Sequence, residues 1–142
     1  MKYLIALAAF AATVSLMAAD GAATYVDHDK VSALFVKGGS IAKGGDYSVS
    51  ANKRTGPGQV EVHDKETDIF HVMEGEATLV TGGKMIGGKQ TRADQWLGSN
   101  IEGGTTYHLS KGDVVTVPAG TPHWFKEVPT GITYYTVKVI KP

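Results

Sequence analysis

The chain has 142 residues, of which 42% are hydrophobic and 20% are charged, with 14 acidic side chains balanced by 14 Lys and Arg. This length and composition suit one globular domain with its own core, and the even charge gives no indication of a nucleic-acid partner. Cysteine is absent, which excludes disulfides and thiolate chemistry. A bound metal would therefore need imidazole and carboxylate ligands, which suit a divalent Mn, Fe, Ni, Zn or Cu(II) ion.

Residues 1–19 have the layout of a secretory signal peptide. Lys2 gives a positive start, an uncharged apolar run follows from Tyr3 to Met17, and two alanines precede Asp20. Such a segment is short for a membrane span, so it predicts export to the periplasm or the extracellular space and no membrane contact after cleavage. The alternative is an uncleaved anchor.

Residues 20–39 are predicted to form a linker and one short amphipathic helix. The apolar side chains at helical spacing are Val31, Leu34 and Phe35. Asp27 or Asp29 can cap the start of this helix, and Gly38 with Gly39 can end it.

Residues 40–142 are predicted to form an all-β barrel or sandwich, because short alternating segments are separated by Gly or Pro. The expected strands are 47–51, 59–63, 68–73, 77–81, 105–109, 114–117, 123–127 and 132–140. Between them, 84–86 and 89–91 are predicted to pair as a hairpin on Gly87-Gly88. Trp96 follows in a loop at 92–100, where it either covers a ligand at the barrel mouth or plugs one end of the core.

Two stretches carry residues suited to metal chemistry. In the first, Glu61 and His63 are two positions apart in an alternating segment, so their side chains leave the same face of a strand. Asp68 follows a polar turn and is expected to begin the return strand of a hairpin, with its carboxylate turned toward that face. The second stretch, 111–127, would bring His123 to the same place.

The spacing of both stretches resembles the two motifs of the cupin superfamily. In the first motif, Glu61 stands where the family has a His, Asp68 stands where it has a Glu, and the leading Gly56 is one position late. The second motif has Glu127 where the family usually has Asn, and its other fixed positions are matched by Gly112, Pro118, Gly120 and His123. The resemblance covers 56–127 and implies a double-stranded β-helix, which is a jelly-roll barrel.

The resemblance implies one divalent metal ion held by Glu61, His63, Asp68 and His123. Each acid has another reading. Glu61 could be a solvated strand residue or could orient His63 without touching the metal, and Asp68 could cap the turn before it. Without Glu61, the set has two histidines and one carboxylate, which favours iron and oxygen chemistry. A metal-free relic of the fold is the remaining alternative.

Alternation also predicts which side chains line the interior. Phe70 follows Asp68 inward, whereas His71 faces outward with Ile69 and Met73. Phe125 and Glu127 share the face of His123, and Trp124 turns away. The expected substrate-lining residues are Phe70, Phe125 and Tyr135, with ordinary core packing as the alternative, and Glu127 is the candidate proton donor or acceptor.

These observations leave two main classes of function. One is an exported metal-dependent enzyme that acts on a small oxygen-bearing molecule by oxygenase, lyase or isomerase chemistry. The other is a non-catalytic cupin that binds or sequesters a small molecule, a sugar or a metal ion. A structural surface protein is a third option. The outward apolar residues predict a homodimer, unless the helix at 27–37 covers them.

Overall fold

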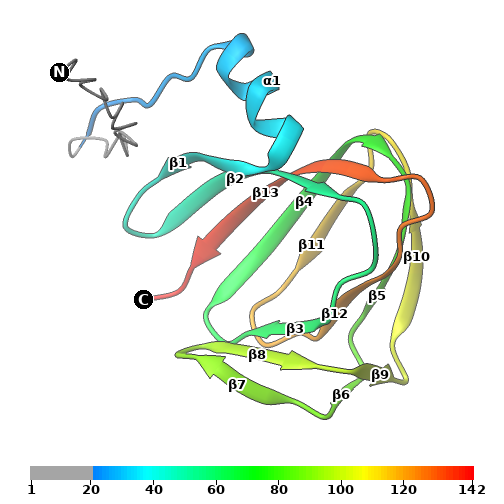
Figure 1. Cartoon of the computed structure of the whole chain (residues 1–142). Helices are drawn as coiled ribbons and strands as arrows, with labels where there is room; N and C mark the ends of the chain where they lie inside the picture. Colours follow the sequence, from blue (N-terminus) through cyan, green and yellow to red (C-terminus); the bar gives the residue numbers. More distant parts are fainter. Residues whose placement is uncertain (1–20) are drawn as a thin grey trace, which may run out of the picture.

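The computed structural model describes residues 21–142, so the predicted signal peptide at 1–19 lies outside the described residues. Strands dominate the described chain and form two facing sheets (Figure 1). The five-stranded sheet has the order β1 (Gly39–Lys43), β2 (Tyr47–Arg54), β13 (Ile132–Ile140), β4 (Glu66–Gly75) and β11 (Val114–Val117).

The second sheet has six strands, and a separate two-stranded ribbon lies beside it. The order of the six-stranded sheet is β10 (Thr105–Leu109), β5 (Ala77–Thr81), β12 (His123–Glu127), β3 (Val60–His63), β8 (Gln95–Gly98) and β7 (Lys89–Arg92). The ribbon consists of β6 (Lys84–Ile86) and β9 (Asn100–Glu102). This architecture confirms the predicted all-β jelly-roll barrel.

One short helix, α1 (His28–Lys37), packs on β1 and β2 at one end of the five-stranded sheet (Figure 1). Of the two predicted caps, Asp27 is the N-cap, and its side chain accepts a hydrogen bond from the backbone N–H of Lys30 at 3.0 Å. Gly38 ends the helix with a φ of 83°, a conformation that favours glycine. The Phe35 ring meets Tyr135 edge-on at 4.9 Å, which anchors the helix to β13. Among the described residues, no helix is long and apolar enough to cross a membrane.

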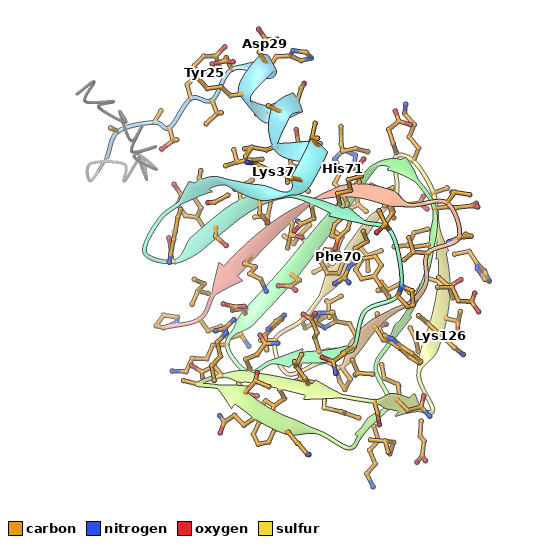
Figure 2. The ribbon with its side chains drawn as sticks, viewed as in Figure 1. Tyr25, Asp29, Lys37, Phe70, His71 and Lys126 are labelled. Carbon is orange, nitrogen blue, oxygen red and sulfur yellow. The ribbon has the colours of Figure 1, made fainter. Side chains whose placement is uncertain are left out.

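The interior between the sheets has an apolar end and a polar end. Apolar side chains fill the first, and they include Val72, Leu79, Val117, Phe125 and Ile132. The buried polar side chains at the other end are His63, Asp68, Gln95, His123 and Thr136. Phe70 points into the interior where the two ends meet (Figure 2).

The region between the two motifs pairs differently from the predicted hairpin. β6 pairs with β9, and β7 pairs with β8, so the Gly87-Gly88 turn separates two ribbons instead of joining paired strands. Trp96 lies on strand β8, where its ring N–H donates to the Asp64 carboxylate at 3.0 Å. It therefore neither plugs the core nor lines the polar cavity.

Several strands contain an extra residue that breaks the inward–outward alternation. Lys126 is unpaired in β12 against β5, Met73 in β4 against β13, and Thr91 in β7 against β8. Such bulges shift every later side chain on the strand to the other face. They decide which residues reach the interior beyond each bulge.

Candidate metal centre and its cavity

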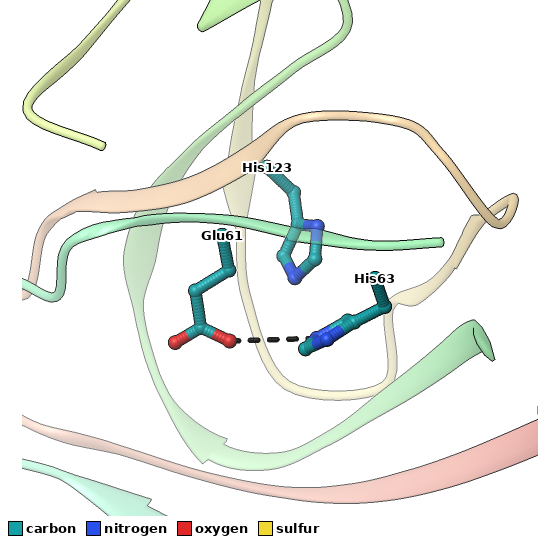
Figure 3. A group of neighbouring side chains, drawn as sticks. All are labelled: Glu61, His63 and His123. Carbon is teal, nitrogen blue, oxygen red and sulfur yellow. Dashed lines mark ion pairs between the residues drawn. The ribbon is translucent and has the colours of Figure 1, made fainter. Parts of the chain in front are cut away.

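Glu61, His63 and His123 come together on two neighbouring strands of the six-stranded sheet. Glu61 is paired directly with His123 across β3 and β12, and His63 lies two residues further along β3 (Figure 3). The Glu61 Oε2 atom is 3.5 Å from His63 Nε2. One donor atom from each of the three side chains lies within 4.8 Å of the others, so they form a cluster that could hold a metal ion.

Asp68 approaches the same place from the opposite sheet. Its Oδ2 atom is 3.4 Å from His63 Nε2 and 3.6 Å from His123 Nε2. The expected hairpin is wrong, because β3 pairs with β8 and β12 whereas β4 pairs with β11 and β13. The turn at 64–65 instead carries the chain from one sheet to the other, and Asp68 faces the histidines across the interior.

The orientation of His123 suits a metal ligand. Its Nδ1 atom lies 3.2 Å from the Thr121 carbonyl oxygen, and a carbonyl can only accept, so Nδ1 carries the proton. Burial lowers the pKa of His123, which favours the neutral ring. The lone pair of Nε2 therefore faces Asp68, as in metal-binding histidines whose other nitrogen is held by a backbone carbonyl.

His63 has the opposite protonation preference. Burial lowers its pKa, but the carboxylates of Asp68 and Glu61 outweigh this effect and raise the pKa of His63 to about 9. In return, His63 lowers the pKa of Glu61. Burial raises the pKa of Asp68, but His63 and Lys138 outweigh it and lower that pKa. In the metal-free protein, a proton on His63 therefore neutralises part of the carboxylate charge that a metal cation would neutralise.

Lys138 is a site residue that the sequence analysis missed. It is paired with Asp68 across β13 and β4, and its Nζ atom lies 2.7 Å from Asp68 Oδ1 and 2.8 Å from Glu66 Oε2. The sequence signal for it was the one charged residue of this strand, a lysine at the same alternation parity as Ile132.

Glu66 belongs to a second, overlapping group of possible ligands with His63 and Asp68. Lys138 pairs with Glu66 Oε2, as it does with Asp68 Oδ1, and so holds one oxygen of each carboxylate. Arg54 adds a second cation, 3.7 Å from Glu61. Three carboxylates thus face two cations, which leaves one negative charge in excess before His63 is protonated. The two cations therefore compensate most of the carboxylate charge around the candidate ligands.

The donor set fits a divalent metal. Two imidazole nitrogens and two carboxylates converge from both sheets, and the Asp68 oxygen that faces the histidines is the one that Lys138 leaves free. His63 faces Glu61 and Asp68 with Nε2, and its buried Nδ1 atom has no hydrogen-bond partner and lies 3.6 Å from Glu66 Oε2. The structure thus brings together all four predicted ligands.

A cavity of about 310 Å³ opens beside this cluster. Besides the candidate ligands and two aromatic rings, its wall carries polar side chains from both sheets, namely Ser50, Asn52, Arg54, Gln59, Arg92, Gln95, Tyr134, Thr136 and Lys138. The bulge at Thr91 places Arg92 opposite Gln95, where its guanidinium donates to the Gln95 side-chain oxygen at 3.1 Å. This wall is rich in hydrogen-bond donors.

Two of the three predicted lining aromatics face this cavity. Phe70 and Phe125 line it, with ring centroids 5.5 Å apart. Tyr135 does not, because its partner across β13 and β4 is the outward-facing His71, and its ring packs on Phe35. Its neighbour Tyr134 occupies the expected place, stacked on Phe125 at 5.0 Å.

Glu127 lies outside this cavity, contrary to the alternation count. The bulge at Lys126 turns it toward Thr78, whose hydroxyl donates to Glu127 Oε2 at 2.9 Å. Both residues border a different, more open cavity near His108. The predicted proton donor or acceptor is therefore not beside the candidate metal ligands.

The fold and the cluster together define a jelly-roll barrel with a candidate metal centre between its sheets. The family model described as Cupin matches residues 18–139, so the chain belongs to the cupin family. Cupins commonly bind a divalent metal ion, and the His, Glu and Asp cluster of this chain could hold one. No curated protein matches the chain.

Solved structures support the fold. A Bacillus halodurans protein is similar with a TM-score of 0.60 and 16% identity, covering 86% of this chain and 85% of that one. The Cnp3 cupin domain of Schizosaccharomyces pombe is similar with a TM-score of 0.55 and 15% identity, covering 74% of this chain and 64% of that one. A cupin superfamily protein of Desulfitobacterium hafniense is similar with a TM-score of 0.51 and 15% identity, covering 74% of this chain and 77% of that one. At these identities the likeness concerns the fold alone.

Proposed function

We propose that this protein binds one divalent metal ion through Glu61, His63, Asp68 and His123, and that the ion holds a small oxygen-bearing molecule in the adjoining cavity. The observation that carries the proposal is the convergence of one Asp68 oxygen on the Nε2 atoms of both histidines, from the opposite sheet. Four protein ligands would leave two positions on a six-coordinate ion for such a molecule.

The chain's own residues have separable tasks in this proposal. Lys138 holds Asp68 in place, and the Phe70 and Phe125 rings exclude water from one side of the cavity. Tyr134 and Arg54 present donors to acceptor oxygens. Burial raises the pKa of the Tyr134 hydroxyl, so this group remains a donor at neutral pH. The ion, when bound, would supply Lewis acidity or oxygen activation.

The choice between an enzyme and a container depends on proton transfer. With Glu127 outside the cavity, the described acids that line it are Glu61 and Asp68, and both are candidate ligands. This observation favours the non-catalytic alternative, in which the barrel binds or sequesters the molecule. Mass spectrometry of small molecules released on denaturation can identify the bound molecule. Incubation of that molecule with the protein then separates the two classes. A molecule that stays intact supports the container, and one that is converted with many turnovers per chain supports the enzyme.

Elemental analysis tests the metal assignment. The wild-type protein is expected to bind one metal ion per chain, and His63→Ala and His123→Ala are expected to lose it. His71→Ala is the matched control, because His71 lies on the outer face of the five-stranded sheet. Stoichiometric metal that persists in both site variants would contradict the assignment.

We also propose that the protein is exported, on the basis of the leader-like residues 1–19. The expected mature chain begins near residue 20, and its N-terminus can be read by mass spectrometry of periplasmic or culture fractions. A full-length chain confined to the cytoplasmic fraction would contradict export.

A homodimer remains a proposal with a narrower basis than the sequence suggested. Ile69, His71 and Met73 lie on the five-stranded sheet, whereas Trp124 lies on the six-stranded one and donates to the Gly58 carbonyl at 2.8 Å. They therefore do not form one patch. Light scattering of the mature chain at rising concentration is expected to give twice the chain mass, and a constant single-chain mass would oppose the dimer.

A further inference from the structure

Arg54 is held in the cavity wall by contacts on three sides. Its guanidinium carbon lies 4.8 Å from the centre of the Phe125 ring, and its Nε–H donates to the Tyr134 hydroxyl at 2.9 Å. Stacking on an aromatic ring and a hydrogen bond at Nε fix the plane of the guanidinium. The two terminal nitrogens remain as the part of the side chain that can meet a ligand.

Gly58 provides the third side of this slot. A Cβ atom at position 58 would lie 2.6 Å from Arg54 Nη1, so any larger residue there would displace the end of the arginine side chain. The backbone there is fixed, because the Gly58 N–H donates to the Phe125 carbonyl at 2.9 Å and its own carbonyl accepts from Trp124. The position of Arg54 is therefore defined by the Phe125 ring, the Tyr134 hydroxyl and the hydrogen-bonded backbone at Gly58.

The terminal nitrogens of Arg54 are only weakly engaged. The Nη2 atom lies 3.7 Å from Glu61 Oε1, which is longer than a hydrogen bond. Glu61 in turn reaches His63 through its other oxygen, so the Arg54 fork lies next to the candidate metal ligands. A ligand group between Arg54 and the ion would therefore need two adjacent acceptor oxygens.

We propose that Arg54 anchors the carboxylate of a small hydroxy- or oxo-carboxylate whose neighbouring oxygen reaches the metal. This inference rests on the metal proposed above and names the class of molecule that the cavity accepts. The planar fork matches a carboxylate with two parallel hydrogen bonds. A single negative charge fits beside the Glu61 carboxylate, whereas a phosphate group with up to two charges would be repelled more strongly.

The test uses protein loaded with Mn²⁺, whose paramagnetism broadens the proton signals of molecules bound beside it. Glycolate and ethylene glycol each offer two neighbouring oxygens, but only glycolate carries a carboxylate. Arg54→Met is expected to weaken glycolate binding about 10- to 100-fold, which is the usual weight of a charge-assisted hydrogen bond. Ethylene glycol affinity is expected to fall much less than glycolate affinity, and Mn²⁺ content at saturating Mn²⁺ is expected to stay unchanged.

A second pair of variants moves Arg54 without removing its charge. Gly58→Ala pushes the guanidinium out of its slot, and Gly56→Ala is the matched control because a Cβ there meets open space. Gly58→Ala is expected to weaken glycolate binding, and Gly56→Ala is expected to leave it unchanged. Arg92→Met removes another positive charge from the cavity and is expected to have the smaller effect.

Several outcomes would overturn the assignment. These are equal glycolate affinity in the wild type and in folded Arg54→Met, a loss confined to Arg92→Met, or tighter binding of inorganic phosphate than of glycolate. A wild-type protein that holds none of Mn²⁺, Fe²⁺, Ni²⁺, Zn²⁺ or Cu²⁺ would contradict the metal proposal separately. Glycolate titration of that metal-free protein, followed by calorimetry, would still test Arg54 as a carboxylate anchor.

Discussion

Lys138 donates to Asp68 Oδ1 at 2.7 Å from the position directly across β13 and β4. The other oxygen of this carboxylate, Oδ2, is the one that faces both imidazoles. The lysine thus restricts Asp68 to a single free oxygen toward the candidate metal. It also binds Glu66 Oε2, so one lysine neutralises part of the charge of two neighbouring carboxylates.

Replacing Lys138 by Met is expected to have opposite effects on the metal-free protein and on metal affinity. The buried Asp68 loses its cation, which should lower the free energy of unfolding of the metal-free protein by about 1–3 kcal/mol. Loss of the lysine charge makes the cluster more negative and releases Glu66, and both changes should raise the affinity for a metal cation. Melting with and without EDTA and a metal titration measure both effects. Lys53→Met, at an exposed position of β2, is the control, and equal destabilisation with and without metal would contradict the prediction.

The stability of the metal-free protein is expected to fall as the pH rises past neutrality. The pKa of His63 is raised to about 9 in the folded protein, above its ordinary value of 6.5. The folded state therefore binds more protons between these two values, so this contribution is fully present below pH 6.5 and is lost as the pH passes about 9. Urea unfolding at several pH values measures the slope, and His63→Gln should flatten it.

The same proton gives metal binding a pH dependence. An ion needs the unprotonated His63 ring, so binding below the pKa of about 9 must release a proton. Metal affinity should therefore rise with pH between 6.5 and 9. Calorimetry in buffers of different ionisation enthalpy counts the released protons, and a binding heat independent of the buffer would oppose the prediction.

Tyr134 and Tyr135 form a matched pair on opposite faces of β13. Tyr134→Phe removes the oxygen that accepts from Arg54 Nε and should weaken glycolate binding several-fold, about the effect of one hydrogen bond. Tyr135 packs on Phe35 outside the cavity, so Tyr135→Phe should leave glycolate binding unchanged. Equal losses in both variants would indicate a general effect on the barrel.

The apolar end of the interior should contribute to stability independently of the metal. Leu79 is completely buried, so Leu79→Ala should lower the free energy of unfolding by about 2–5 kcal/mol through lost contacts and the cavity left behind. Val114 is 62% exposed, and Val114→Ala should change little. Both variants should keep their metal content, which elemental analysis can check.

The sequence predicted the local features of the site. Alternation placed Glu61 and His63 on one face because β3 is short and regular, and the motif spacing singled out His123. The N-cap at Asp27 was likewise readable, because capping depends on the residue itself and the turn that follows it.

The errors arose where alternation is interrupted or where pairing must be known. The extra residue at Lys126 reverses the face of Glu127, and no composition signal marks it. Tyr135 could be assigned to a face only from the register of β13 against β4, whereas the alternation parity of Lys138 was visible in the sequence but its partner Asp68 was not. Asp68 lies near the histidines, as predicted, but on the opposite sheet and not on the second strand of a hairpin. The sheet to which a strand belongs depends on long-range pairing, which the local sequence does not reveal.

The candidate ligands are divided between the layers, with Glu61, His63 and His123 on one sheet and Asp68 on the other. An ion at their centre would act as a removable cross-link between the two sheets, which are otherwise joined at this point by side-chain packing and by the ion pairs Arg54–Glu61 and His63–Asp68. Chelation should then loosen both halves together, and amide hydrogens of β3 and β4 should exchange faster in step.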